Sequence, residues 1–243
     1  MALLSETGQK RKPLGGGTRI SRQQAGEFDV VDLQECDLDR INRHGARLHV
    51  GAMVRLVGLL QHPEVNQEIK RAIRIDASEN SRNITTLGGW LVSSSGRSIL
   101  STLLLALDSN LTWEPKANRV RLGDWLPLRR KEAPGLLITE VDWGVDPKLV
   151  FESVARSPKD RPTLIVAVAQ WHSGRTRIAL GGYGHEAIIA VDGTDENGAD
   201  LACRDAYFDA GDQWATAEYR REVAARLALR CIKRLHAMQE SEV

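Results

Sequence analysis

Three consecutive glycines, Gly15-Gly16-Gly17, constrain this chain more than any other feature of its sequence. Glycine inside a helix or strand costs about 1 kcal/mol relative to alanine, so the run predicts a loop with a special backbone requirement. Glycine permits a positive φ and leaves room for another group to contact the main chain. Such a loop can point several N–H groups at one anion, and the Thr18 hydroxyl adds a donor. A flexible turn near the terminus is the alternative.

The loop lies in a basic stretch of the sequence. The cations are Lys10, Arg11, Lys12, Arg19 and Arg22, and the nearby acid is Glu6. This cluster suits a pyrophosphate held by backbone amides. A solvated charged face without a ligand is the alternative. Contact with nucleic acid is a weaker interpretation, because the cluster lacks interleaved aromatic residues and the chain has a net charge of only +1.

A second glycine stretch, Ser81 to Trp90, reads Ser-Arg-Asn-Ile-Thr-Thr-Leu-Gly-Gly-Trp. We expect a loop here, in which Gly88 and Gly89 let the backbone approach the same anion from the other side. Asn83 is expected to brace this loop, because asparagine readily bonds to nearby backbone. The sequence therefore predicts that the two stretches face a single diphosphate.

These motifs resemble a known family, the FAD-binding subunits or domains of the molybdenum hydroxylases, such as xanthine dehydrogenase and carbon monoxide dehydrogenase. That family carries an Ala-Gly-Gly-Thr-Asp/Asn-Leu loop near its start and an Arg-Asn-x-Ala-Thr-Ile-Gly-Gly-Asn loop later. It also has Ile-Gly-Ala-Met/Thr, Leu-Leu-Ala-Leu, Ala-Leu-Gly-Gly and Ser-Ala-Glu-Tyr-Arg-Arg segments. Their counterparts here are Val50–Met53, Leu104–Leu107, Ala179–Gly182 and Thr216–Arg221. The matches follow the family order over most of the chain.

The resemblance implies an α+β fold. We expect a PCMH-type FAD-binding domain of two small α/β subdomains over residues 1–131. A C-terminal domain of antiparallel sheet plus helices, like that of the carbon monoxide dehydrogenase flavoprotein, is expected over residues 132–243. The boundary falls in a charged stretch that ends in Pro134-Gly135. Against the family pattern the N-terminus is shortened by the first strand and much of the first helix.

The resemblance also implies a function, which is to bind FAD and pass electrons from iron–sulfur centres to an acceptor. The chain would be the flavoprotein component of a molybdopterin-dependent oxidoreductase. Its partners would be a molybdopterin-binding large subunit and an iron–sulfur small subunit. The residues expected to bind the cofactor are Leu14, Gly15, Gly16, Gly17, Thr18, Arg19, Asn83, Thr86, Leu87, Gly88 and Gly89.

Three positions depart from the family pattern. Arg19 and Trp90 each stand where the family has Asp or Asn, and Ile99 stands where an Asp helps to hold the flavin. Arg19 could pair with a phosphate and Trp90 could stack on a ring, whereas Ile99 can do neither. Two interpretations therefore stay open. The chain is a FAD-binding electron-transfer subunit, or it is a paralogue that kept the fold, lost or altered the cofactor and acts as a structural or docking subunit.

Other kinds of site find no support in the sequence. The three cysteines form no Cys-x-x-Cys, and the six histidines show no metal-ligand spacing, so we expect no metal site. There is no Gly-x-Ser-x-Gly, Rossmann or Walker motif, so any redox chemistry would come from the cofactor. The longest apolar run is too short to cross a bilayer and the N-terminus lacks a secretory pattern, from which we expect a cytoplasmic protein.

Hydrophobic periodicity predicts the regular elements. Strands are expected over residues 28–33, 47–51, 111–113, 119–122, 136–143, 163–171, 175–180 and 187–191. Helices are expected over residues 53–60, 65–75, 99–107 and 212–236, with a polar loop over 192–200. His172-Ser173-Gly174 predicts a tight hairpin, and so an antiparallel pairing of the strands that flank it.

Overall fold

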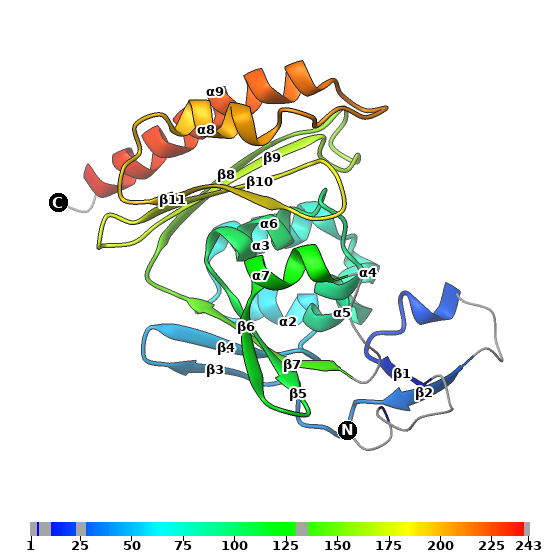
Figure 1. Ribbon diagram of the computed structural model, residues 1–243. Helices are drawn as coiled ribbons and strands as arrows, with labels where there is room; N and C mark the ends of the chain where they lie inside the picture. Colours follow the sequence, from blue (N-terminus) through cyan, green and yellow to red (C-terminus); the bar gives the residue numbers. More distant parts are fainter. Residues whose placement is uncertain (1–3, 5–10, 23–27, 130–135, 241–243) are drawn as a thin grey trace. The chain divides into compact units, whose positions relative to one another are not determined.

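The computed structural model describes residues 4, 11–22, 28–129 and 136–240 (Figure 1). The chain divides into two compact units, each assembled from separate stretches. The first comprises residues 1–65, 77–93 and 109–145, and the second comprises residues 66–76, 94–108 and 146–243. Both units combine helices with an antiparallel sheet, which confirms the predicted α+β class.

The first unit is built on a five-stranded antiparallel sheet. Its strands, in spatial order, are β3 (Ile41–His44), β4 (Arg47–Gly51), β7 (Leu137–Gly144), β5 (Asn110–Glu114) and β6 (Asn118–Arg121). Side chains alternate between the two faces, as a strand requires. Leu48, Val50 and Leu111 are fully buried on one face, whereas His49 and Thr112 point to the other, polar face.

Short helices and a small second sheet complete this unit. The helices are α2 (Leu56–Gln61), α4 (Glu79–Ile84), α5 (Leu87–Ser93) and α7 (Leu122–Trp125), with 3-10 turns η1 (Ile20–Arg22) and η2 (Leu126–Leu128). Strands β1 (Arg11–Leu14) and β2 (Asp29–Asp32) pair in parallel. The run of three glycines connects β1 to η1. Strand β4, which was predicted over residues 47–51, pairs with β3 on one side and with β7 on the other.

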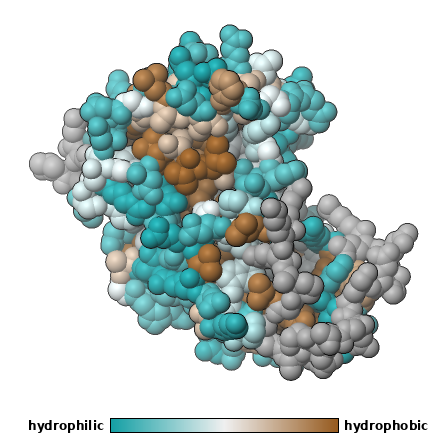
Figure 2. Space-filling view, in the orientation of Figure 1, coloured by the Kyte–Doolittle hydropathy of each residue, from teal (hydrophilic) through white to brown (hydrophobic). Residues whose placement is uncertain are grey.

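The second unit contains a four-stranded antiparallel sheet in the order β11 (Ile188–Gly193), β10 (Thr176–Gly181), β9 (Leu164–Gln170) and β8 (Lys148–Val154). Every residue of β9 is buried. Helices α8 (Ala199–Ala206) and α9 (Ala217–Glu240) cover one face of this sheet, and α3 (Gln67–Asp76) and α6 (Ile99–Ala106) cover the other (Figure 1). Figure 2 shows apolar side chains where the edge strand β11 lies in Figure 1, and Ile188 in that strand is 37% exposed.

The observed units differ from the predicted division after residue 131, a boundary that itself lies outside the described residues. Strand β7 follows that point but pairs with β4 and β5, so it belongs to the first unit. Helices α3 and α6 precede it but belong to the second unit. Composition along the chain could not reveal this division, because pairing between distant segments sets it.

Most predicted elements are present, with shifted ends. The His172–Gly174 hairpin joins antiparallel β9 and β10 as predicted. Several segments differ. We did not predict β1, β3, β8 or α7. In addition, α8 occupies the end of the predicted polar loop, and α4 and α5 occupy the second glycine stretch. Within the part of the chain that the structure describes, no helix is long and apolar enough to cross a membrane.

Candidate functional site

The structure brings the two glycine stretches into contact inside the first unit. A Cβ atom placed on Gly15 would lie 2.9 Å from Thr86 Oγ1, and one placed on Gly16 would lie 1.7 Å from the Ile84 carbonyl oxygen. Thr86 Oγ1 also accepts a hydrogen bond from the Gly89 amide at 3.2 Å. The close approach that requires glycine at positions 15 and 16 is therefore made by the protein itself, whereas we expected an anion to make it.

The first stretch keeps its amides available. Gly17 has a φ of +70°, which turns the backbone at the centre of the loop. The amides of Gly16, Gly17 and Thr18 donate no hydrogen bond to any residue that the structure describes. Successive N–H groups at a turn with a left-handed residue form a concave site for anionic oxygen atoms. The positive φ and the amides without an acceptor among the described residues agree with the expected loop, and binding of an anion there stays a prediction.

The second stretch is helical at both ends and uses its amides internally. Gly88 and Gly89 lie in the first turn of α5. The amides of Leu87, Gly88, Gly89 and Trp90 donate to Val54 O, Ala52 O, Thr86 Oγ1 and Thr86 O at 2.8, 2.9, 3.2 and 2.8 Å. A Cβ on Gly88 would lie 2.9 Å from the Ala52 Cβ. These glycines therefore let α5 pack closely on its neighbours, and their amides are not free for a diphosphate, contrary to expectation.

Both stretches line one cavity of about 440 Å³, here called the glycine cavity. Its volume lies within the usual range of about 300–1,000 Å³ for small-molecule sites. The predicted residues that line it are Gly15, Gly16, Gly17, Thr18, Arg19, Thr86, Gly88 and Gly89. Three predicted residues do not: Leu14 lies in β1, Asn83 is exposed on α4, and Leu87 is fully buried.

The charged residues that line the glycine cavity are Lys12 and Arg19, and no acid lines it among the described residues. Lys12 Nζ lies 3.9 Å from the centre of the Phe28 ring. Arg19 Nη1 lies 3.5 Å from the Val92 carbonyl oxygen, a long contact that leaves its other donors for a ligand. Of the remaining basic residues, Arg11 does not line the cavity, the Arg22 side chain is not described, and Lys10, like Glu6, lies outside the described residues. The cavity is therefore suited to an anion.

Part of the lining of the glycine cavity is apolar, and the sequence patterns did not reveal most of it. Met53, Trp113 and Ile138 belong to this apolar lining. Trp113 is 7% exposed and packs on Trp125 with ring centres 5.6 Å apart. Met53 falls in a segment that matched the family, but no local signal marked Trp113 or Ile138. Pairing of β5 with β7 brings those two residues to the site.

Two of the three departures from the family pattern lie outside the glycine cavity. Trp90 is half-buried on α5 and is not among the lining residues. Ile99 is fully buried at the start of α6 in the second unit. There the Asp76 carboxylate accepts hydrogen bonds from the Ser98 hydroxyl and from the Ile99 and Leu100 amides at 2.9, 3.0 and 2.8 Å. Burial raises the pKa of Asp76 to about 6 despite these hydrogen bonds.

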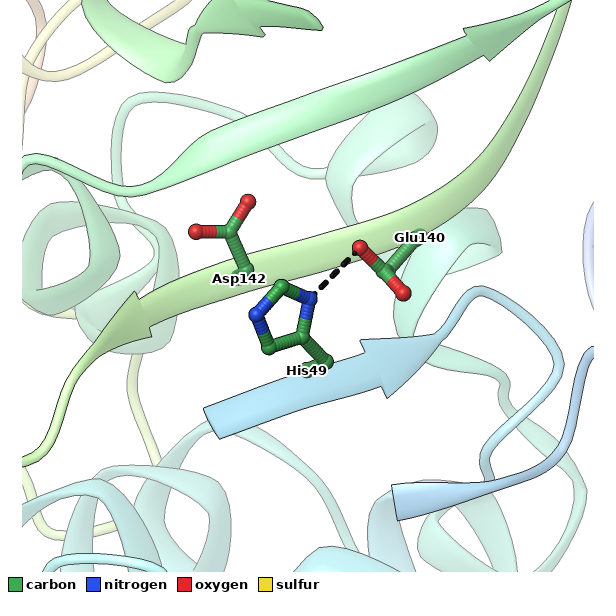
Figure 3. Close-up of side chains that lie close together, drawn as sticks. All are labelled: His49, Glu140 and Asp142. Atoms are coloured by element: carbon green, nitrogen blue, oxygen red, sulfur yellow. Dashed lines mark hydrogen bonds and ion pairs between the residues drawn. The ribbon is translucent and has the colours of Figure 1, made fainter. Parts of the chain in front are cut away.

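A separate titratable group, His49, Glu140 and Asp142, lies on the polar face of the five-stranded sheet (Figure 3). His49 Nδ1 and Glu140 Oε1 are 2.9 Å apart. Asp142 is 1% exposed and accepts hydrogen bonds from Arg47 Nε and, at 3.1 Å, from Arg119 Nε. Burial opposes ionisation of Asp142, but the hydrogen bonds from Arg119 and Arg47 outweigh it and hold its pKa below the usual range. Because two guanidinium groups already neutralise this carboxylate, we interpret the group as an ion-pair network and not as a metal centre.

The first part of the chain matches the model of a known protein family. Residues 1–142, more than half of the chain, match the model described as the FAD binding domain in molybdopterin dehydrogenase. Among curated proteins, the chain is similar to the uncharacterized protein YgfM of Escherichia coli strain K12. The two are 26% identical over 202 residues, which covers 80% of this chain and 75% of that protein.

Solved structures with the same fold include two enzymes. The chain matches reconstituted CO dehydrogenase from Oligotropha carboxidovorans with a TM-score of 0.82 and 23% identity, over 96% of this chain and 92% of that one. It matches quinoline 2-oxidoreductase from Pseudomonas putida 86 with a TM-score of 0.77 and 22% identity, over 96% and 91% of the two chains. These matches extend across both units, and they confirm the fold that the resemblance implied.

Proposed function

The chain belongs to the family of FAD-binding domains of the molybdopterin dehydrogenases, and we propose on that basis that it binds FAD in the glycine cavity. The observation that carries this proposal is the run of unpaired amides from Gly16 to Thr18, next to Lys12 and Arg19 and without a lining acid among the described residues. A diphosphate needs this combination of backbone donors and positive charge. The Thr18 hydroxyl adds one further donor.

The apolar part of the lining of the glycine cavity suits part of the same ligand. Met53, Trp113 and Ile138 offer apolar surface on which a flat ring can pack. Bound FAD would supply the redox chemistry, and the residues of this chain would bind and orient it. Thr86 would act indirectly, because its hydroxyl fixes the Gly89 amide and contacts the first loop at Gly15.

We further propose that the protein is the electron-transfer subunit of an oxidoreductase complex. It would pass electrons from iron–sulfur centres through FAD to an acceptor. Its partners would be a molybdopterin-binding large subunit and an iron–sulfur small subunit. Two observations support this proposal: the structural neighbours are chains of CO dehydrogenase and quinoline 2-oxidoreductase, and the sequence contains no nucleophile motif of its own.

A second candidate function is that of a structural or docking subunit without a cofactor. Two observations favour it. The amides of the second stretch, from Leu87 to Trp90, are all bonded within the protein. The position expected to hold an acidic flavin contact is the buried Ile99 of the second unit.

Titration of FAD into the purified protein distinguishes the FAD-binding function from the cofactor-free one. We expect saturable one-to-one binding, measured by quenching of flavin fluorescence and a shift of the flavin absorbance. A Lys12→Gln/Arg19→Gln double variant should bind FAD at least tenfold more weakly, because both cations line the cavity. Arg11→Gln is the matched control, since Arg11 belongs to the same basic stretch but does not line the cavity. Wild-type protein that stays free of flavin in millimolar FAD would establish the cofactor-free function instead.

A further inference from the structure

Helix α9 of the second unit has one side in the core and an opposite side that is exposed (Figure 1). The buried residues that it contributes to the core are Ala224, Leu227, Ala228, Cys231 and Leu235. On the opposite side, positions three or four residues apart form a stripe, because such positions lie on one face of a helix. This outer stripe consists of Tyr219, Glu222, Arg226, Leu229, Arg230 and Lys233.

Large apolar side chains are exposed on the outer stripe and on the helix beside it. In the stripe, Tyr219 is 43% exposed and Leu229 is 51% exposed. Helix α8 packs beside α9, and there Leu201 is 57% exposed. Phe208, which follows α8, is 66% exposed. Aromatic and aliphatic side chains of this kind serve as anchors in protein–protein interfaces, so this helical layer offers a surface on which another protein can pack.

The charges of α9 are ordered along its length. Acids lie toward the N-terminal end and cations follow them: Glu218 and Glu222, then Arg226, Arg230 and Lys233. Lys233 makes no ion pair with any residue that the structure describes. A complementary helix would present cations first and acids afterwards when it is followed in the same direction. A second α9 that runs antiparallel to the first has this order, and a two-fold axis makes the pairing reciprocal.

One register of two antiparallel α9 helices pairs their charges. With the two-fold axis at the middle of the outer stripe, Glu222 lies opposite Lys233 of the second copy, and this pair occurs twice. The two pairs are about three helical turns apart. Between them Arg226 lies opposite Leu229 of the second copy, where the aliphatic stem of the arginine can cover the leucine. A parallel arrangement would instead place like charges opposite each other.

We propose that the outer stripe of α9, together with the exposed apolar residues Leu201 and Phe208, is an interface with a second copy of this chain. The two α9 helices run antiparallel across a two-fold axis, with Glu222 of each copy paired to Lys233 of the other. The proposal does not depend on flavin binding, because no residue of this surface lines the glycine cavity.

Sedimentation velocity of the purified full chain over a range of concentrations tests the proposal. We expect a reversible dimer with twice the 26.9 kDa mass of one chain. Glu222→Lys and Lys233→Glu each create two like-charge contacts per dimer, so each should weaken dimerisation at least tenfold. An equimolar mixture of these two variants should dimerise again, because a mixed dimer regains two opposite-charge pairs. Arg74→Glu is the matched control, since it changes the charge equally on α3 of the same unit.

A wild-type chain that stays monomeric at high micromolar concentration would overturn this proposal and leave the proposed function intact. A dimer that both variants leave unchanged, or a mixture that stays monomeric, would overturn it as well. Glu222 also pairs with Arg204 at 3.1 Å, so thermal unfolding of each variant checks for a folding defect. If Glu222→Lys fails to fold, Leu229→Arg decides: it places a cation beside Arg226 of the second copy and should weaken the dimer without touching that ion pair.

Discussion

The two glycine stretches have similar sequences, but their backbone amides differ in hydrogen bonding. In the first, the amides of Gly16, Gly17 and Thr18 are unpaired among the described residues. In the second, the amides of Leu87, Gly88, Gly89 and Trp90 are all bonded within the protein. Adjacent glycines in a sequence therefore indicate close approach of another group to the backbone. They do not identify that group as a ligand.

Within the first stretch the three glycines also differ from one another. A Cβ on Gly16 would collide with the Ile84 carbonyl, whereas a Cβ on Gly17 would meet nothing nearer than Leu14 Cδ1 at 3.7 Å. Gly16 is thus required by internal packing and Gly17 by its positive φ. Four changes, in order of decreasing effect, test this comparison.

Gly16→Ala should have the largest effect. The added Cβ would lie 1.7 Å from a backbone oxygen that cannot rotate away, so the two stretches must separate. We expect a loss of about 3 kcal/mol in the free energy of unfolding, measured by urea denaturation, together with weaker FAD binding. Unchanged stability would show that the first loop does not pack on Ile84.

Gly17→Ala should lower the free energy of unfolding by about 1–2 kcal/mol, because alanine is strained at a φ of +70°. The measurement is again urea denaturation, with FAD titration alongside. If the diphosphate contacts this amide, FAD affinity should fall at least severalfold as well. A variant with lower stability but unchanged FAD affinity would show that the ligand does not contact Gly17.

Gly88→Ala should lower the free energy of unfolding by about 1 kcal/mol. Crowding against Ala52 should cost about 2 kcal/mol, and the higher helix propensity of alanine in α5 should offset about 1 kcal/mol of that cost. Because the Gly88 amide is bonded to Ala52 O, we expect FAD affinity to change less than threefold. A stable Gly88→Ala protein that no longer binds FAD would show that the second stretch contacts the ligand after all.

Raising the salt concentration from 0.05 to 0.5 M should have the smallest effect, a roughly threefold weaker binding of FAD, because screening reduces the attraction of Lys12 and Arg19 for a diphosphate. The Lys12→Gln/Arg19→Gln variant should show almost no salt dependence in the same titration. Equal salt dependence in both proteins would assign the electrostatic attraction to other residues.

The sequence predicted the fold and the meeting of the two glycine stretches, since both follow from motifs in family order. It did not predict that the second stretch is helical, because Gly88 and Gly89 disfavour a helix locally and only packing on Ala52 and Val54 overrides that preference. The sequence also did not predict that Trp113 and Ile138 line the glycine cavity. Pairing of β7 with β4 and β5 brings these residues to the cavity, and no local pattern encodes a register between distant strands.

Thr86 links the two stretches through a single oxygen atom. Its Oγ1 lies against Gly15 and accepts a hydrogen bond from the Gly89 amide. One side-chain oxygen therefore contacts both the first loop and the start of α5. Occupancy of the loop should therefore be detectable on the helix: we expect deuterium exchange at the Gly89 amide to slow when FAD is added. Thr86→Val, which keeps the shape of the side chain but has no oxygen to share, should make that amide exchange quickly with or without flavin.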